Sequence, residues 1–564
     1  VQRFAAFFTV FPVLYYSILV GESPSSLRAT IMAVVYLLSI TLQREGNIFN
    51  TLSIAALIIL IWHPPSLFNA GFQLSFMAVL SIAYGFLRLP DLLSCSSRNQ
   101  ENAILKNPVK SFSLRHRWVY NYIVSSFFAT LGTFPIIEYH FNLISIIGLI
   151  VNIIAIPLSS LIVPLTLIFS MLSIIRKQIA SLLIEIPVFL TFLLMEIARR
   201  FTSIPYYSMR VQTPYTITVI MIYLLLSGVL NFTRHKLIKI GTMTICLFLI
   251  ISVGFRILIS NSALRTPDSL KIIFIDVGQG ESSLIRFPNG KTMLIDGGGL
   301  MGDFDIGGNV VAPYLWDIGI TKIDYVIGSH PDSDHVGGLL FILDEMTVKN
   351  YYDNGQESKD LSLFNLRKIV RDKNIPYKVL QTGDTIKVDE GIQVDILHPL
   401  NQFGVRSLEF RGKPQNSNLY TQYSRGHDNN LSIVIKITYG NFSILFTGDI
   451  EKEAERFLVG QIENGLPSPL FHKEGGKVWL KSTIIKVPHH GSNSSSTEEF
   501  IRAVSPEVAV FSVGYNNPFR HPSKKVLSRY RDKGVKIYRT DWDGMIEIES
   551  DGMVYAVKKY EQGG

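Results

Sequence analysis

Residues 329–338 have the sequence SHPDSDHVGG, which places His330, Asp332, Asp334 and His335 within six positions. The preceding residues, IDYVIGS, predict a buried strand, so the four side chains follow directly from a strand end. Imidazole nitrogens and carboxylate oxygens are ligands for divalent metal ions, and two carboxylates crowded into one turn are unfavourable without a cation. The stretch predicts a metal site at one rim of a sheet. The alternative is a solvated acidic turn.

The residues around this stretch predict an α/β domain. From about residue 268 the pattern is one of short β-rich runs separated by Gly, Asp and Asn turns, and GGLLFILDEM directly after the motif predicts a helix. The predicted strands lie in KIIFIDV, SSLIRF, KTMLID, IDYVIGS, LSIVIKI, FSILFTGD, TIIKVPH and VAVFSVG. More candidate ligands follow two of these strands, because Asp449 ends FTGD and His489 and His490 end KVPHH.

The composition separates this domain from the first part of the chain. The 564 residues are 48% hydrophobic and 17% charged, whereas soluble domains contain about one quarter charged residues. Residues 1–264 hold 18 Lys and Arg against 7 Asp and Glu, while residues 265–564 hold 35 against 38. We therefore expect a membrane domain over 1–264 and a soluble domain over 265–564. The only cysteines, Cys95 and Cys246, exclude a disulfide framework and a thiolate zinc cluster.

Nine apolar runs of the first part approach the length that crosses a bilayer, about 17 to 25 residues. They predict a polytopic bundle, because buried helices of a soluble protein would rarely follow one another with such short links. The runs lie at about residues 4–20, 27–43, 47–62, 72–88, 119–137, 141–156, 158–175, 216–231 and 237–257.

Residues 178–198 decide the side of the membrane on which the soluble domain lies. Glu185 and Glu196 interrupt this run, so it can either span or lie flat on the surface. The loop 89–117 and the link 232–239 are rich in Lys and Arg and both predict cytoplasmic segments by the positive-inside rule. Both can be cytoplasmic if 178–198 lies flat. We favour that reading, which places the chain after residue 257 outside the cytoplasm.

Polar and helix-breaking residues inside the apolar runs indicate a transport path, because intramembrane polar groups are costly and tend to face a bundle interior. Their alternative role is to hydrogen-bond neighbouring helices. The residues are Gln73, Pro135, Glu138, His140, Asn152 and Pro157.

A basic segment near the end of the chain predicts contacts with a phosphate backbone. The turn YNNPFRHP contains Asn516, Asn517, Arg520 and His521, and residues 520–539 carry eight Lys and Arg, Lys524 and Lys525 among them, against one Asp. A basic helix face that only contacts solvent is the alternative.

The ordered motifs of the second part resemble the metallo-β-lactamase fold, an αββα sandwich with a dinuclear metal site. The resemblance implies two divalent ions, one held by His330 and Asp332, the other by Asp334 and His335, with Asp449 bridging them. One of His489 and His490 completes the second site, and we favour His490 as the ligand and His489 as a substrate contact. Two ions of this kind activate water and stabilise charge on the attacked centre, which gives Asp334, His335, Asp449 and His489 catalytic roles.

Two departures from that family affect the choice of metal. Asp332 stands where many members have His, and the family's third His falls in HDNNLS, where Asn429 or Asn430 is the match and His427 a substitute. We assign Asn429 to substrate binding. More oxygen donors make Mn²⁺ or Mg²⁺ compete with Zn²⁺. A degenerate, weakly metallated site is the alternative.

Both parts together resemble the ComEC family of bacterial DNA-internalisation competence proteins. The motifs include NTLSIAALIILIWHPPSLFNAGFQLSFMAVLSIAYG and FPIIEYHFNLISIIGLIVNIIAIPLSS in the first part, then FIDVGQGESSLI, LIDGGG, SHPDSDHVGG, LFTGDIEKEAE, KVPHHGS, FSVGYNNPFRHP and YRTDWDG. Family members usually carry further N-terminal helices and a small extracytoplasmic domain, so we expect the sequence, which begins at Val1, to be truncated.

The ComEC resemblance implies an inner-membrane channel for one DNA strand and a metal-dependent nuclease that degrades the other. DNA, membrane lipids, a DNA receptor and an ATP-dependent translocation partner are the implied partners, and no GxxxxGK[ST] loop is present in the chain. Whether DNA passes through one subunit or between copies in a homo-oligomer stays open. The alternatives are a membrane-tethered metallohydrolase acting on another substrate, and a DNA channel whose soluble domain binds without cutting.

Overall fold

The computed structural model divides the chain into two compact units, Val1–Leu258 and Ile259–Gly564, which are described separately. The predicted boundary between residues 264 and 265 lies outside the described residues. The structure describes residues 2–19, 24–42, 47–94, 114–145, 147–204, 208–232, 236–261, 269–301, 304–356, 361–400, 428–463 and 480–560.

The first unit is helical, with apolar side chains exposed along most of its helices. Three helical stretches are long and apolar enough to cross a membrane, namely Ala70–Leu89, Gly148–Ile175 and Lys177–Thr202, and four shorter apolar helices accompany them in the described part. The helices are α1 (Gln2–Leu19), α2 (Pro24–Thr41), α3 (Ile48–Trp62), α4 (Ala70–Ser94), α6 (Leu114–Phe141), α7 (Gly148–Ile175), α8 (Lys177–Leu183), α9 (Glu185–Thr202), α10 (Thr216–Leu230) and α11 (Lys236–Asn261).

One prediction about this unit is wrong. Residues 141–156 and 158–175 are not two spans but largely one continuous 28-residue helix, α7, preceded by the short strand β1 (Leu143–Ser145). Pro157 and Pro164 lie inside this helix and do not end it, as is tolerated where neighbouring groups satisfy the freed backbone. The strand β1 pairs with β2 (Ser208–Arg210) and so joins the start of α7 to the link after α9.

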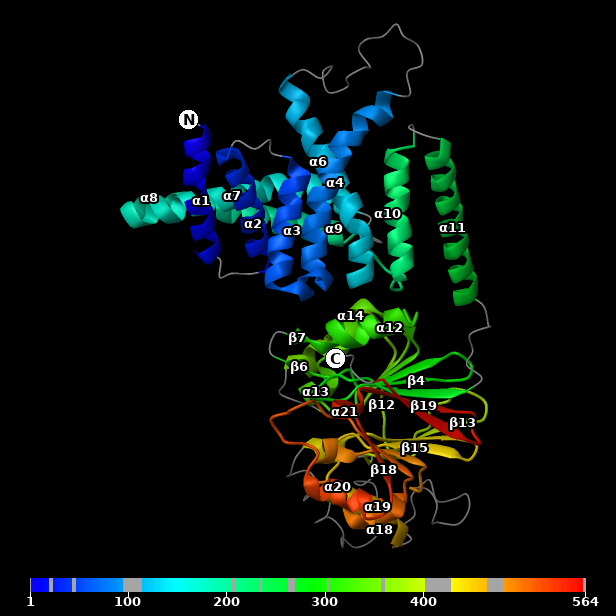
Figure 1. Cartoon of the computed structure of the whole chain (residues 1–564). Helices are drawn as coiled ribbons and strands as arrows, with labels where there is room; N and C mark the ends of the chain where they lie inside the picture. Colours follow the sequence, from blue (N-terminus) through cyan, green and yellow to red (C-terminus); the bar gives the residue numbers. More distant parts are fainter. Residues whose placement is uncertain are drawn as a thin grey trace. The chain divides into compact units, whose positions relative to one another are not determined.

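The stretch 178–198 forms α8 and α9, which are separated at Ile184. Together with α7, these helices run crosswise to α1 to α4, α6, α10 and α11 within the first unit (Figure 1). Their length and composition also suit a membrane span. The flat position of 178–198 stays a prediction.

The residues predicted to line a path make contacts between helices, and they do not line the cavity described below. Gln73 Oε1 lies 2.9 Å from His140 Nε2, so this pair links α4 to α6. The carbonyl of Asn152 accepts a 2.7 Å hydrogen bond from the Tyr122 hydroxyl. A cavity of about 390 Å³ lies between α4, α6 and α10 instead, and Gln73, Glu138 and Asn152 are not among its lining residues.

The described part of the second unit contains two large sheets. The first has eight strands in the order β12-β11-β9-β5-β4-β3-β19-β20, and the second has six in the order β13-β14-β15-β16-β17-β18. The first consists of β3 (Leu270–Phe274), β4 (Ser283–Arg286), β5 (Thr292–Ile295), β9 (Tyr325–Ile327), β11 (Tyr351–Asp353), β12 (Tyr377–Val379), β19 (Met545–Ser550) and β20 (Tyr555–Tyr560). The second consists of β13 (Ile392–His398), β14 (Val434–Tyr439), β15 (Phe442–Phe446), β16 (Ile484–Lys486), β17 (Val508–Phe511) and β18 (Lys536–Arg539).

Alternation along the strands builds three apolar layers. Ile272 and Phe274 of β3 pack between the sheets, whereas Ile273 faces outward. Ile484 and Ile485 of β16 divide in the same way, toward the inner layer and the outer helices. Each side chain thus follows the period of two that a strand covered on both faces requires.

Helices cover the outer face of each sheet. The first sheet is covered by α12 (Ala312–Asp317), α13 (Ser333–Val336), α14 (Leu339–Glu345) and α15 (Leu361–Asp372), and the second by α18 (Lys452–Glu463), α19 (Glu498–Val504) and α20 (Lys524–Arg531). The predicted αββα sandwich is confirmed, and each predicted strand is present (Figure 1). Its three large apolar clusters contain only residues of this unit, so the unit has a core of its own.

Candidate metal centre

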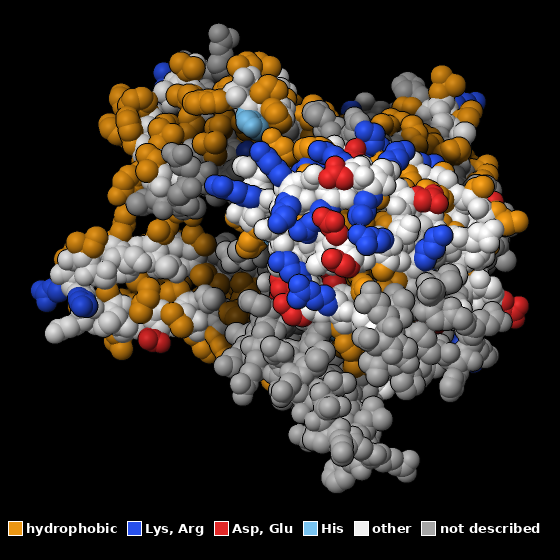
Figure 2. All heavy atoms as spheres, turned by 90° about the horizontal axis from the view of Figure 1, so that it is seen from below, with side chains coloured by type: hydrophobic (Ala, Val, Ile, Leu, Met, Phe, Trp, Pro, Cys, Tyr) orange, Lys and Arg blue, Asp and Glu red, His pale blue; other side chains and the backbone are white. Residues whose placement is uncertain are grey.

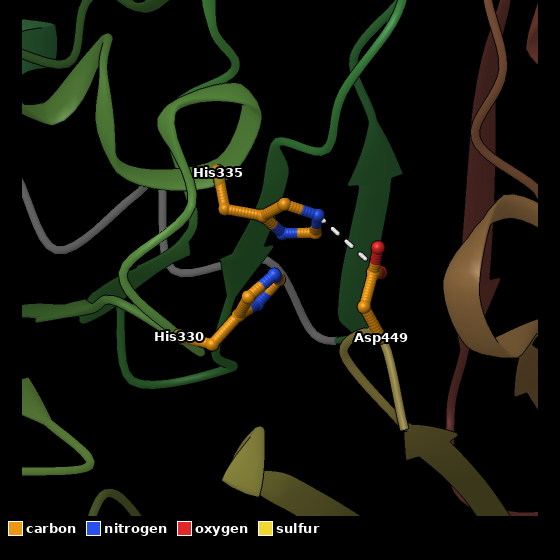
Figure 3. A group of neighbouring side chains, drawn as sticks. All are labelled: His330, His335 and Asp449. Atoms are coloured by element: carbon orange, nitrogen blue, oxygen red, sulfur yellow. Dashed lines mark ion pairs between the residues drawn. The ribbon is translucent and has the colours of Figure 1, made fainter. Parts of the chain in front are cut away.

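The candidate ligands gather where strands of both sheets end. His330 follows β9, Asp332 is the N-cap residue of α13, and Asp334 and His335 lie on α13 itself. Asp449 follows β15 of the other sheet, and His490 follows β16. His330, His335, Asp449 and His490 are all buried. In Figure 3, His330 and His335 on one side and Asp449 on the other point toward a common point.

Close backbone packing explains the glycines at the contact between the end of the SHPDSDHVGG motif and the LIDGGG loop. A Cβ atom on Gly338 would lie 2.0 Å from the carbonyl oxygen of Gly297, which only a glycine avoids. Across the same contact, Gly338 N donates to Gly298 O at 2.9 Å and Gly297 N donates to His335 O at 2.8 Å. The LIDGGG loop therefore packs directly on α13 and fixes the position of His335.

Hydrogen bonds behind two histidines fix their tautomers. His335 Nδ1 lies 2.8 Å from Asp296 Oδ2, and His490 Nδ1 donates to the Ser512 carbonyl at 2.7 Å. In the neutral rings, both Nε2 atoms then carry lone pairs, yet these two atoms lie only 3.3 Å apart. The arrangement matches that of metal-binding histidines, whose second nitrogen donates to a carboxylate or carbonyl.

Carboxylate oxygens complete the cluster. Asp449 Oδ1 lies 3.3 Å from His335 Nε2, Asp449 Oδ2 lies 3.3 Å from His490 Nε2, and Asp334 Oδ2 lies 3.6 Å from His490 Nε2. The ligand atoms of His330, His335 and Asp449 lie within 4.8 Å of one another, as do those of Asp334, His335 and His490. His330 Nε2 is buried and has no hydrogen-bond partner among the described residues. Lone pairs that converge in this way fit a divalent cation.

The electrostatics of the cluster agree with that fit. Burial by itself would lower the pKa of His335, but Asp449 and Asp296 raise it well above its ordinary value. Burial would likewise raise the pKa of Asp449, but His490, His335 and Lys486 hold it well below the usual range. The cluster therefore attracts positive charge, which either a proton or a metal ion can supply.

Sequence reasoning missed three buried charged residues around the cluster. Asp296 accepts from Ser329 N and Ser329 Oγ, both at 2.7 Å, in addition to contacting His335. Glu281 and Lys486 form an ion pair with both side chains fully buried. The ends of the strand motifs LIDGGG and VGQGE could have indicated Asp296 and Glu281, whereas one lysine in the apolar strand TIIKV gives no signal.

The two adjacent histidines differ in their burial and in their contacts. His490 is buried among the candidate ligands, while the His489 side chain is 22% exposed and its Nδ1 lies 3.0 Å from Glu451 Oε1. Both residues have positive φ angles, 48° and 52°, a conformation that costs energy for a non-glycine residue and clusters at functional sites. Burial lowers the pKa of His489, but Glu451 and Asp449 raise it overall.

Of the two asparagines that match the family's third histidine, Asn430 has a structural role. The Asn430 side chain accepts from Glu451 N at 2.9 Å and Ala454 N at 3.3 Å, so it caps the start of α18. Asn429 is half-buried, and its carbonyl accepts from Ser432. His427 lies outside the described residues. Asp332 has a side chain that is 45% exposed, with Oδ2 3.5 Å from His330 Nε2.

The turn 515–523 borders the cluster. The ring of His521 meets that of His489 edge to face, with ring centroids 5.8 Å apart. Burial together with the charges of His489 and His490 lowers the pKa of His521 to about 4. Asn517 has a structural role, because its side chain bonds to the backbone of Gly514 and His521. Asn516 and Arg520 are exposed.

The basic segment divides into exposed and engaged residues. Lys524, Lys525 and Arg531 are exposed on α20, whereas Arg529 donates to the carbonyls of Ser495 and Ser496. Arg539 is buried and pairs with Asp541. Figure 2 shows a face on which Lys and Arg side chains gather with a few Asp and Glu side chains among them. The segment is therefore not one continuous basic stripe.

Comparisons with known proteins agree with this architecture. Residues 1–236 match the family model of the Competence protein, and residues 275–359 match that of the metallo-β-lactamase superfamily. ComE operon protein 3 of Bacillus subtilis is 26% identical over 97% of this chain and 64% of its own length. Competence protein ComA of Neisseria gonorrhoeae is 28% identical over 48% of this chain and 31% of its own length.

Among solved structures, the metallo-β-lactamase fold protein YhfI from Bacillus subtilis has 12% identity and a TM-score of 0.27, covering 48% of this chain and 96% of that one. The two family models match consecutive parts of the chain, the Competence model the helical part and the metallo-β-lactamase model the start of the α/β part. The resemblance to the ComEC family is thereby confirmed, since ComE operon protein 3 aligns across both domains. The chain spans less than two thirds of that relative.

Proposed function

We propose that this chain takes part in DNA uptake, with a helical unit that conducts one DNA strand across the inner membrane and a metal-dependent phosphodiesterase unit that degrades the other. The observation that carries the hydrolase half is the convergence of His335 Nε2, His490 Nε2 and both Asp449 oxygens within 3.3 Å contacts. One metal ion can accept all of these lone pairs together, whereas a single proton is shared by only two of them. The uptake half is supported by the similarity to the competence proteins.

Asp334, His335, Asp449 and His490 would hold a divalent ion, with His330 and Asp332 as further donors. Such an ion supplies Lewis-acid stabilisation of the negative charge that develops on a phosphodiester during hydrolysis. His489 would exchange a proton with substrate, because Glu451 occupies its Nδ1 and its Nε2 lies toward the cluster, 3.9 Å from Asp449 Oδ2. Arg520, Lys524 and Lys525 would contact the phosphate backbone outside the cluster.

The proposed topology places the hydrolase unit outside the cytoplasm. The end of α4, the start of α6, the end of α10 and the start of α11 lie on one side of the helical unit (Figure 1). Arg115 and Arg117 at the start of α6, and Lys236 and Lys239 at the start of α11, therefore share that side. The positive-inside rule makes it cytoplasmic, and α11 then leads the chain to the opposite side. Because α7 to α9 run crosswise to the other helices, they add no membrane crossing between α6 and α10 in this topology.

The proposed partners are membrane lipids, a DNA receptor and an ATP-dependent translocation protein. The last is included because the sequence contains no GxxxxGK[ST] motif. The proposal also includes the association of several copies of the chain in a homo-oligomer.

A nuclease assay on residues 259–564 tests the proposal, because this unit has its own core. Single- and double-stranded DNA would be incubated with Mn²⁺, Mg²⁺ or Zn²⁺, comparing the unchanged unit with a double variant, Asp334→Ala and His335→Ala. Asp344→Ala is the matched control, because this carboxylate is exposed and pairs with Lys373. We expect metal-dependent cutting that the double variant loses and the control retains.

Binding of DNA without cutting, with any metal, would favour a channel whose soluble unit only holds DNA. The structural role of Asn430 at the third ligand position is the observation behind that second candidate. Cutting of a non-nucleotide ester but not of DNA would favour the tethered metallohydrolase.

A further inference from the structure

Lys486 brings a permanent positive charge into the metal cluster. It is the last residue of β16, in the interior of the six-stranded sheet, and its side chain is completely buried. A buried ammonium group persists only where carboxylates and hydrogen-bond acceptors surround it. Lys486 Nζ has both kinds of partner: it forms ion pairs with Glu281 and, at 3.4 Å, with Asp449 Oδ1, and it donates a 3.0 Å hydrogen bond to the Gly448 carbonyl.

The contact with Asp449 divides the two oxygens of the carboxylate that would bridge a metal pair. Oδ1 faces Lys486 Nζ and His335 Nε2, at 3.4 and 3.3 Å. Oδ2 faces His490 Nε2 at 3.3 Å and His489 Nε2 at 3.9 Å. One oxygen thus already has a cation beside it, while the other lies among histidine nitrogens.

The charges of the buried cluster also indicate that Lys486 takes the place of one cation. Glu281, Asp296 and Asp449 are three buried acidic groups, and carboxylates so close together require positive charge to stay ionised. Lys486 supplies one positive charge. The ligand group implied for a second metal ion is also short of donors, because the Asn430 side chain caps α18 and the Asp332 side chain is 45% exposed.

We infer that Lys486 stands in for one of the two cations of the centre, so that each chain binds one divalent ion and not two. The ammonium group neutralises Glu281 and the Oδ1 side of Asp449, and it leaves Oδ2 with Asp334, His335 and His490 for the ion. Lys486 is then a positioning residue that orients Asp449. This inference rests on the metal centre of the proposed function, but not on the substrate.

Metal stoichiometry tests the inference without reference to activity. The full chain, purified in detergent and stripped with EDTA, would be titrated calorimetrically with Mn²⁺ alone and Zn²⁺ alone, and the bound metal measured by elemental analysis after dialysis. We expect one ion per chain. Lys486→Ala should raise the capacity to two ions, because Glu281 and Oδ1 of Asp449 then face a space without a cation. Two ions on the unchanged chain would overturn the inference.

A double variant guards against misfolding. Lys486→Ala leaves Glu281 unpaired, whereas Lys486→Met with Glu281→Gln removes both charges and keeps most of the volume. We expect this double variant to fold, as judged by circular dichroism, and to bind one ion with altered affinity. A folded Lys486→Ala variant that still binds one ion would also overturn the inference. One ion per chain without DNA cleavage would leave it standing and refute the proposed nuclease.

Discussion

His398 makes the stability of the second unit depend on pH between 7.5 and 4. This residue ends β13 and is 3% exposed, and its Nδ1 donates to the Ser432 carbonyl at 3.1 Å. Burial lowers its pKa from 6.5 to about 4, against the effect of that hydrogen bond. Above pH 7.5 the ring is neutral in both the folded and unfolded states. As the pH falls, the unfolded chain takes up the proton first, so the folded state loses stability.

The magnitude follows from these two pKa values. Between pH 7.5 and pH 5.0 the linkage relation gives a loss of about 2 kcal/mol in the free energy of unfolding from His398 alone. The loss levels off below pH 4 at about 3 kcal/mol, because the folded state then binds the proton as well. His398→Gln keeps a donor for the Ser432 carbonyl and removes the titration.

Urea unfolding of residues 259–564 measures this effect. Both the unchanged unit and His398→Gln would be followed by far-ultraviolet circular dichroism at pH 7.5 and 5.0, with EDTA present so that metal binding does not contribute. Other titrating groups act equally in the two proteins and cancel. The unchanged unit should lose about 2 kcal/mol more than the variant over this interval. Equal losses in the two proteins would refute the account of a buried, neutral histidine.

Four further outcomes are expected. Asp296→Asn should weaken Mn²⁺ or Zn²⁺ binding about 10- to 100-fold in calorimetry, because His335 loses the carboxylate that orients it; an unchanged affinity would contradict this role. Gly338→Ala should destabilise the second unit by about 1 to 3 kcal/mol in urea unfolding, since its Cβ would meet the Gly297 carbonyl oxygen. Lys524→Glu with Lys525→Glu should weaken DNA binding and reduce its salt dependence in fluorescence anisotropy, and an unchanged salt slope would exclude these lysines. Topology can be tested in a chain in which Cys95 and Cys246 are replaced and one cysteine is introduced at position 236 or 551. The cysteine at Lys236 should react with an impermeant maleimide only from the cytoplasmic side, and the cysteine at Asp551 only from outside. The reverse pattern would show that the proposed topology is inverted.

The sandwich could be predicted because its strands are short, apolar and bounded by turn residues, and because its ligands follow strand ends. The dipeptide His489-His490 shows the limit of that reasoning, since two successive positive φ angles are a product of the surrounding fold. Lys486 could not be predicted, because its meaning depends on Glu281 from a distant loop. Local sequence cannot encode which carboxylate a buried lysine meets.

The boundaries of the membrane helices were harder to predict from the sequence. The two runs predicted at 141–156 and 158–175 meet at Pro157, but a proline inside a helix interrupts only one turn of hydrogen bonds, and α7 continues through it. The number of basic residues in 520–539 also did not predict how many of them are exposed. Arg529 and Arg539 bear the expected charge but direct it at backbone carbonyls and Asp541, so counting charges overestimated the surface that DNA could meet.

The origin of the ligands in both sheets has a mechanical consequence. His330 and His335 come from the rim of one sheet, Asp449 and His490 from the rim of the other, so a bound ion would fasten the two halves of the sandwich at that rim. An ion at a hundred times its Kd adds about 2.7 kcal/mol to the stability of the form that binds it. Metal supply would thus add to the stability of the folded domain, and loss of the ion would remove one link between the two sheets at that rim.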